Sequence, residues 1–575
     1  MYLQKSMKSY LICAIAVLVS VPVFAAQTNV FTKENLNKVT SYLENNIATK
    51  TNVFNYKGKD YTCKSIPGAM IAAPVDKTSP KLDNGYEYTW ARDTAISMHT
   101  IASLYKHAIT SNNRNDIQKY GNYLYNYITN WLPKTVFQNP ADISMFYVDS
   151  KQAPRTFQAD GPPARVRALT YMSDIFINNP QIIRLADKTI ELNKEFVRNN
   201  IFNPKKPKTD LIGYELAYIT KNWNTRTVGL WEMTHGHHYY TQMLDLNALV
   251  RGAVLAKQLG YKNWTSKSLK QAYKIAVNLK SFYQEWKYYG EKHNLSEPQI
   301  SMKIITELQN SEGKPIKVTD KWYEDYQRAG GLNTSVILGS LYGNIFDDFQ
   351  KGSEAYKLLS TYKYYKKLRA NLNNFNFLPY SNEMIQTAYY IRNANVAKTV
   401  EPAYALGIDV YKINTKENLV DGFGPYIGRY PSDHYNGLNW SNINVKGNPW
   451  FITTAGLARY YYNLAYEYKV MGEIKIPDGK SSTPDVIDFF RQSSGIKNLK
   501  PGIYKKGSKK FNKIIIGLID SGDVMMKSVN KIAEKYDMHM SEQIGRNTGK
   551  EVSFQNLSWS YSSYIDTKTA YNNCN

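Results

Sequence analysis

Carboxylic acids stand beside tryptophan, tyrosine and glycine in three segments, Tyr86–Asp93, Leu230–Tyr240 and Ser541–Tyr561. Hydrolysis of a glycosidic bond needs one carboxylic acid that protonates the leaving oxygen and a second carboxylate across from it. Glu232 directly follows Trp231, and packing against an indole ring would desolvate this acid and keep it protonated for that task. A single glutamate is more often a solvated surface residue, so the three segments indicate this chemistry only when taken together.

The sequence gives less support to metal-dependent catalysis, to a serine nucleophile or to phosphate binding. His235, His237 and His238 follow Glu232 closely, but neighbours in one short segment do not converge on one point as metal ligands must. The chain contains no G-x-S-x-G nucleophile motif and no glycine-rich phosphate loop. We therefore expect neither a metal nor another cofactor.

The elements that must position these acids are predicted to be helices. Apolar residues recur at helical spacing in a dozen segments, and few segments read as strands. The expected helices are 34–48, 93–109, 115–132, 180–199, 238–259, 265–289, 331–343, 350–371, 449–470, 484–493, 515–537 and 556–570. This pattern predicts an all-α domain of antiparallel helical pairs. The long Gly-, Pro- and aromatic-rich segment 421–450 is typical of a functional loop.

The N-terminal residues 1–25 are typical of an export signal. Lys5 and Lys8 precede an apolar run from Leu11 to Phe24, and small residues stand at a plausible cleavage site. The run of about 14 residues is shorter than the roughly 20 that a membrane span needs. We expect a protein without a membrane span, secreted or periplasmic, whose mature chain 26–575 is a single catalytic domain.

Composition excludes several classes of function. The formal net charge is +24, but the lysines and arginines are scattered, so no nucleic-acid partner is expected. Tyrosine supplies 48 residues, and such a surplus of aromatic rings suits packing against sugar rings. Outside the export signal only Cys63 and Cys574 remain, and the sequence leaves open whether they form a disulfide or stay free.

Several separated blocks, in a fixed order, carry a resemblance to a known family. They are W-A-R-D at 90–93, Q-A-D-G-P-P-A-R at 158–165, W-E followed by G and H-Y-Y-T at 231–241, G-R-Y-P to G-N-P-W-F at 428–451, and S-E-Q with L-S-W-S-Y at 541–561. Together they resemble the glucoamylases, the inverting exo-glucosidases of glycoside hydrolase family 15. The resemblance covers roughly residues 80–565.

The resemblance implies a fold and a role for each matched residue. The fold would be an (α/α)6 barrel with the site at one end and, in this chain, no separate starch-binding module, which favours soluble glucans over granules. Glu232 would be the general acid and Glu542 the general base. An α-glucan substrate would be bound by Tyr86, Trp90, Arg92, Asp93, Trp231, Arg328, Tyr435 and Trp450, and Asp160, Gly161 and Arg165 would shape the pocket wall. A monomer is expected.

Three positions and one insertion depart from the family pattern. Met233 replaces a second acid, Pro154 replaces a tryptophan, Leu332 replaces another acid, and Leu438–Lys446 is an insertion in the closing loop. These positions would contact leaving-group sugars, so the sequence leaves chain-length preference and α-1,6 activity open. A related α-glucosidase acting on dextran, isomaltose or trehalose and a non-catalytic glycan-binding protein remain alternatives.

Overall fold

A computed structural model describes most of the chain. The described residues are 29–56, 61–74, 86–138, 142–153, 158–288, 300–309, 329–401, 405–419, 422–437, 445–480 and 483–575. The predicted export signal, 1–25, lies outside these residues, as do Pro154, Arg328 and most of the closing-loop insertion.

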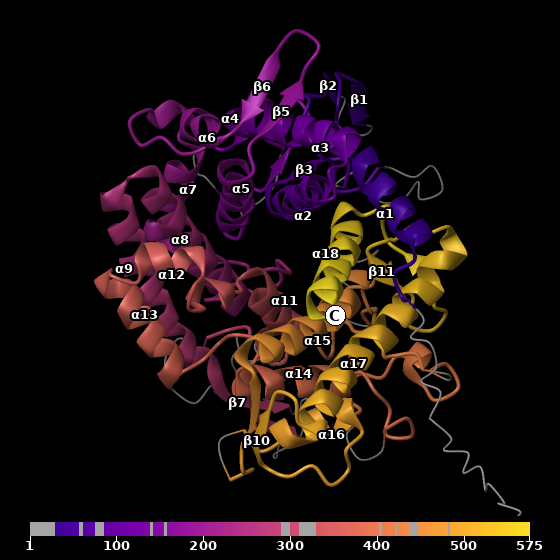
Figure 1. Cartoon of the computed structure of the whole chain (residues 1–575). Coiled ribbons are helices and arrows are strands. Elements are labelled where there is room, and N and C mark those ends of the chain that lie inside the picture. Colours follow the sequence, from indigo (N-terminus) through magenta and orange to yellow (C-terminus); the bar gives the residue numbers. More distant parts are fainter. Residues whose placement is uncertain are drawn as a thin grey trace, which may run out of the picture.

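Six helices form a closed inner ring (Figure 1). In chain order they are α2 (Ala91–Thr110), α5 (Gly161–Asn178), α8 (Tyr239–Leu259), α11 (Thr334–Tyr342), α15 (Phe451–Met471) and α18 (Ser558–Cys574). Each packs against the next, and α18 packs against α2 to close the ring. These helices are buried on nearly all sides; every residue of α11, for example, is buried. They therefore lack the narrow apolar stripe of a surface helix.

A second layer of helices surrounds this ring. Its members are α1 (Lys33–Asn45), α3 (Arg114–Asn126), α7 (Leu211–Asn222), α9 (Lys262–Asn278), α14 (Asn382–Ala394) and α17 (Lys509–Ala533), each of which packs on at least one inner helix. Further helices lie at the periphery: α4 (Leu132–Thr135), α6 (Lys194–Asn200), α12 (Glu354–Leu359), α13 (Lys363–Asn374) and α16 (Val486–Ser494). Two concentric layers of six helices make an (α/α)6 barrel, as the family resemblance implied, and the hydrophobic core lies between the layers.

Strands occur only as short antiparallel pairs in the described chain. The pairs are β1 (Val53–Tyr56) with β2 (Tyr61–Lys64), β3 (Thr89–Trp90) with β4 (Met145–Phe146), β5 (Gln181–Arg184) with β6 (Thr189–Leu192), β7 (Tyr283–Tyr288) with β8 (Ile300–Ile305), β9 (Glu473–Ile476) with β10 (Gly502–Lys505), and β11 (Gln543–Ile544) with β12 (Glu551–Val552). The pair β3–β4 leads directly into α2, and β11–β12 follows Glu542. These two pairs therefore hold the segments that carry predicted site residues.

Several sequence predictions of local structure were wrong. Residues 180–199 were expected to form one helix, but they form the hairpin β5–β6 followed by the start of the helix α6. Ile183 and Leu192 are the only fully buried side chains of that hairpin, and their spacing does not follow a helical period. The helix expected at 265–289 ends at Asn278 and gives way to β7, and the helix expected at 350–371 is split into α12 and α13. The sequence pattern missed α5, α7 and α14 altogether.

The structure also bears on the possible disulfide and on the expected absence of a membrane span. Cys63 and Cys574 are both buried and both free, so the disulfide alternative is not realised. Within the described residues, no helix combines the length and the apolar character that crossing a bilayer requires.

Candidate active site

A pocket opens at the end of the ring where several inner helices begin. It encloses about 640 Å³, open mouth included, and its lining comprises Ala72, Tyr86, Trp90, Arg92, Asp93, Leu230, Trp231, Glu232, Arg429, Tyr435, Trp450, Glu542, Leu557 and Trp559. Most of these residues lie on the first turn of α2 or α18 or on the loops that lead into α2, α8, α15 and α18. The pocket thus faces the positive ends of inner helices, where carboxylates are stabilised.

Glu542 is buried and surrounded by hydrogen-bond donors. Tyr86 Oη donates to its Oε1 at 2.5 Å, while Ser553 Oγ and Tyr435 Oη donate to Oε2 at 2.7 and 3.2 Å. Burial raises the pKa of Glu542, and the hydrogen bonds from Tyr86 and Ser553 oppose that rise. Donors aimed at both oxygens favour the ionised carboxylate, the form that a base requires.

Glu232 occupies a sharp turn with a left-handed backbone. Its φ is +56°, in a region that non-glycine residues rarely adopt. Gln158 Nε2 donates to Glu232 Oε1 at 2.6 Å, and Arg92 Nη1 lies 3.8 Å from the same oxygen. The Glu232 side chain remains 21% exposed to the pocket. Backbone strain of this kind persists where the surrounding structure fixes a side chain for function.

Arg92 gathers three carboxyl groups in one corner of the pocket. Its Nη2 lies 3.2 Å from Asp93 Oδ2, and its Nη1 lies 3.4 Å from Asp160 Oδ2 and donates to the Leu230 carbonyl at 3.0 Å. Burial, opposed by Arg92 and reinforced by the charge of Glu232, raises the pKa of Asp160 to about 6. Burial and the neighbouring carboxylates therefore favour the retention of a proton on Asp160 under mildly acidic conditions.

Aromatic rings form the wall of the pocket. The rings of Trp231 and Trp450 are 5.3 Å apart, those of Trp231 and Trp559 are 6.5 Å apart and nearly parallel, and Tyr435 lies 6.1 Å from Trp450. The Arg429 guanidinium lies within 5.5 Å of the rings of Trp231, Tyr435 and Trp450. Flat apolar faces with polar groups at their edges match the surface of a sugar ring.

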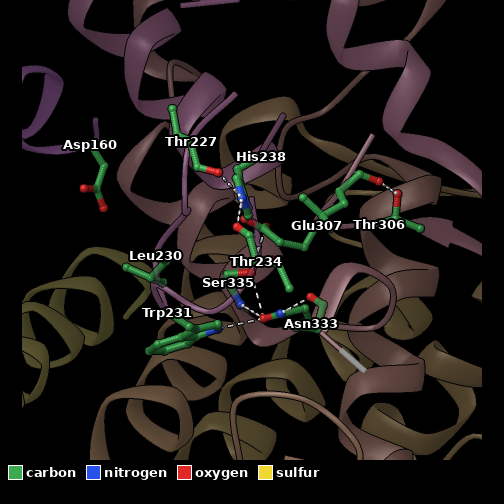
Figure 2. Close-up of polar contacts among 12 residues, drawn as sticks. Asp160, Thr227, Leu230, Trp231, Thr234, His238, Thr306, Glu307, Asn333 and Ser335 are labelled. Carbon is green, nitrogen blue, oxygen red and sulfur yellow. Dashed lines mark hydrogen bonds and ion pairs between the residues drawn. The ribbon is translucent and has the colours of Figure 1, made fainter. Parts of the chain in front are cut away.

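A buried histidine–glutamate contact supports the loop that carries Glu232 (Figure 2). His238 Nδ1 lies 2.9 Å from Glu307 Oε1, and its Nε2 lies 3.0 and 3.2 Å from the carbonyl oxygens of Thr234 and Thr227. Both ring nitrogens therefore lie within hydrogen-bond distance of oxygen atoms, which fixes the orientation of the ring. This histidine pairs with a carboxylate, and among the described residues no three His, Cys, Asp or Glu side chains group as metal ligands.

The same network reaches the pocket wall. Ser335 Oγ donates to Glu307 Oε2 at 2.7 Å and lies 2.7 Å from Asn333 Oδ1. Asn333 Oδ1 also accepts a 2.9 Å bond from the indole nitrogen of Trp231 (Figure 2). The histidine–glutamate contact is thus linked to the residue that immediately precedes Glu232, which fixes the orientation of the turn.

Comparison with known proteins decides the family. Residues 55–569 match the family described as Glycosyl hydrolases family 15. The chain belongs to glycosyl hydrolase family 15. The chain is 25% identical over 518 residues to a glucoamylase of Blastobotrys adeninivorans (88% of this chain, 68% of the relative). It is 24% identical over 560 residues to a glucoamylase of Saccharomycopsis fibuligera (91% and 86%).

Solved structures of glucoamylases share this fold. The glucoamylase of Saccharomycopsis fibuligera gives a TM-score of 0.65 at 21% identity, covering 95% of this chain and 96% of its own. The family 15 glucoamylase of Hypocrea jecorina gives 0.64 at 20% identity, covering 93% and 71%.

The structure brings nearly all the predicted site residues of this family 15 chain together. Tyr86, Trp90, Arg92, Asp93, Trp231, Glu232, Tyr435, Trp450 and Glu542 all line the one pocket, whereas Arg328 lies outside the described residues. The expectation for Arg165 was wrong: it forms a 2.5 Å ion pair with Glu215 in the core, with both side chains almost fully buried. Asp160 pairs with Arg92 at 3.4 Å and does not itself line the pocket.

Sequence reasoning missed five lining residues: Ala72, Leu230, Arg429, Leu557 and Trp559. Arg429 is 1% exposed and bound through two nitrogens to Asp433, at 2.8 and 2.6 Å. Its place inside the G-R-Y-P block was a usable signal, because a buried arginine needs a nearby carboxylate and the sequence offers one four residues later.

Proposed function

We propose that this family 15 hydrolase is a glucoamylase, a glucan 1,4-alpha-glucosidase that releases β-D-glucose from the non-reducing ends of starch, glycogen and maltooligosaccharides. The observation that carries the proposal is a single aromatic pocket that holds one carboxylate saturated with donors, Glu542, and a second, partly exposed acid, Glu232. Named relatives support it, since the similar curated proteins are glucoamylases.

In the proposed mechanism the two acids act from opposite faces of the sugar. Glu232 donates a proton to the glycosidic oxygen while Glu542 takes a proton from water, and that water attacks the anomeric carbon from the face opposite the leaving group. Gln158 orients the acid, and Tyr86 and Ser553 hold the base ionised. Attack from the opposite face inverts the anomeric centre and yields β-glucose.

Binding of the chain end follows from the same pocket. Arg92 and Asp93 present charged groups that can bind sugar hydroxyls in the corner behind Glu232. The rings of Trp231, Trp450 and Trp559 offer apolar faces to the sugar. A pocket of this kind admits one chain end, which supports exo cleavage.

The test is proton NMR of maltotetraose during hydrolysis. We expect β-glucose to appear first and maltotriose to accumulate with it, while Glu232→Gln and Glu542→Gln each lose about 10²–10⁴-fold in kcat with the fold retained. Glu551→Gln, on β12 outside the pocket, is the matched control and should keep its turnover. Initial α-glucose, or turnover retained in either pocket variant, would reject the assignment.

Two alternatives are separated by the same measurement. A panel with isomaltose, dextran and trehalose identifies a related α-glucosidase, which Met233 and the closing-loop insertion leave open. Binding of maltotetraose without any turnover would identify a glycan-binding protein.

Export from the cytoplasm is part of the proposal and rests on residues 1–25. N-terminal sequencing of the protein from its native host should begin near Ala26.

A further inference from the structure

A second cavity lies inside the ring, towards the other end of the inner helices. It encloses about 1300 Å³, open mouth included, and all six inner helices contribute to its lining. Helix α2 contributes to the lining of both cavities. Arg92 and Asp93, in its first turn, line the catalytic pocket, and His99 and Lys106, further along the helix, line the second cavity. The two cavities therefore lie in series along the barrel axis.

Positive charge dominates the inner part of this second cavity. Arg251 Nε lies 3.0 Å from Asp348 Oδ2, and Arg459 Nη1 lies 3.0 Å from Asp566 Oδ2, so these two arginines have carboxylate partners. Arg167 lines the same cavity, and no carboxylate of the described residues lies within ion-pair distance of it. A partly buried guanidinium without a counter-ion is unfavourable, and proteins normally pair such charges.

A second guanidinium stands beside Arg167, and the Asp566 carboxylate near both is in direct contact with Arg459 instead. The guanidinium groups of Arg167 and Arg459 lie 5.3 and 5.4 Å from the centre of the same ring, that of Tyr342. Burial, reinforced by Arg459 and opposed by Asp566, lowers the pKa of Arg167 to about 10. His99, stacked on Tyr171 at 4.4 Å, has a buried Nδ1 without a hydrogen-bond partner.

The mouth and the side wall are also polar. Lys106, exposed and 5.8 Å from the Tyr171 ring, has no carboxylate partner among the described residues. The carboxylates of Asp174 and Asp347 also line the cavity; they accept hydrogen bonds from Asn178 and Tyr466 at 2.8 and 3.0 Å. The inner arginine thus remains without a partner.

Uncharged groups suited to sugar hydroxyls stand beside these cations. Asn247, Gln258 and Asn463 line the cavity, and the buried Asn247 Oδ1 has no hydrogen-bond partner. The ring of Phe346 also lines the cavity. Amides, an aromatic face and a free guanidinium together match a sugar that carries an oxyanion, because arginine binds phosphate oxygens through two nitrogens at once.

We propose that this second cavity binds a small phosphorylated sugar, with the phosphate on Arg167 and the hydroxyls on the amide side chains. The site is distinct from the catalytic pocket and does not depend on the glucoamylase assignment. Only one hydrogen-bonded pair of side chains separates the two, since Trp559 in the catalytic pocket donates to Tyr342 Oη at 3.0 Å.

Isothermal titration calorimetry of the full chain tests this site. The titrants are glucose 6-phosphate, inorganic phosphate and glucose, each in potassium chloride at constant ionic strength. We expect glucose 6-phosphate to bind saturably, with one site per chain. Arg167→Met should weaken binding at least tenfold and Lys106→Met about threefold, because the lysine is exposed and screened. Arg184→Met, an exposed arginine on β5, is the matched control and should bind like the wild type.

Thermal unfolding without ligand separates a binding role from a structural one. Arg167→Met should be at least as stable as the wild type, because it removes an unpaired cation. No saturable heat with glucose 6-phosphate, or equal binding by Arg167→Met, would overturn the proposal. If inorganic phosphate binds as tightly as glucose 6-phosphate, the cavity is a site for the free ion, and the part of the proposal that concerns the sugar is overturned.

Discussion

Replacing Tyr86 by phenylalanine tests whether hydroxyl donors keep Glu542 ionised. The phenol donates to Glu542 Oε1 at 2.5 Å, and its ring stacks on Phe554 with centres 3.6 Å apart. Phenylalanine keeps the stacking and removes only the donor. A hydrogen bond to a charged group contributes about 1.5–3 kcal/mol, and one pKa unit corresponds to about 1.4 kcal/mol.

The direction of the change in the pKa of Glu542 depends on which form of the carboxyl group the Tyr86 hydroxyl stabilises. The hydroxyl stabilises the carboxylate, so its loss raises the pKa of Glu542 by about 1–2 units. A base must be ionised, so the acidic limb of the kcat/KM profile should move to higher pH by the same amount. At a pH below the limb, the variant should therefore be about tenfold or more slower than the wild type.

The assay is the pH dependence of kcat/KM on maltotetraose. Ser553→Ala should shift the limb in the same direction, because Ser553 donates to Glu542 Oε2 at 2.7 Å but does not line the pocket. Tyr105→Phe is the control, since its buried hydroxyl has no hydrogen-bond partner. An acidic limb that stays in place in both Tyr86→Phe and Ser553→Ala would refute Glu542 as the titrating base.

Three further outcomes are expected. His238→Gln should lose about 1–3 kcal/mol in denaturant unfolding, because it removes the imidazole that contacts the buried Glu307 Oε1 at 2.9 Å. An unchanged midpoint would contradict a structural role for this contact. Burial raises the pKa of Glu551 from 4.5 to about 8, so the stability that its protonated form contributes is lost as pH rises through that range. The free energy of unfolding of Glu551→Gln should therefore equal that of the wild type at pH 4. At pH 8 it should be higher by about 2 kcal/mol, after a discount for the partial exposure of the side chain. Gly428→Ala should cost about 1–3 kcal/mol in thermal unfolding, because its Cβ would overlap the hydroxyl of the buried Tyr411, and a wild-type melting curve would exclude that clash.

Helices with regular apolar spacing were predictable from the sequence. Helix α8 lies within one residue of its predicted bounds, and α15 lies within two. Helix α5 was missed because it begins Gly-Pro-Pro and carries arginines among its apolar residues. Arg165 is satisfied by Glu215, fifty positions away. A partner that distant leaves no local signal in the sequence.

The candidate site was predictable where residues stood in recognisable blocks. The nine described residues named from those blocks line one pocket, and both acids are among them. Arg429 and Trp559 stand in those blocks but were not named, although Arg429 had a local signal in Asp433; their contacts with Trp450 and Trp231 come from loops far apart in the chain. The second cavity had no sequence signal, because its lining comes from all six inner helices.

The docking of α18 on α2 has a kinetic consequence. This contact joins segments near opposite ends of the described chain, and pairings so remote in sequence form slowly because much chain entropy must first be lost. Glu542 and Trp559 reach the pocket only with that step, whereas most helices can form locally beforehand. During refolding, far-ultraviolet ellipticity should therefore recover ahead of turnover, and a chain arrested before ring closure would be helical yet inert.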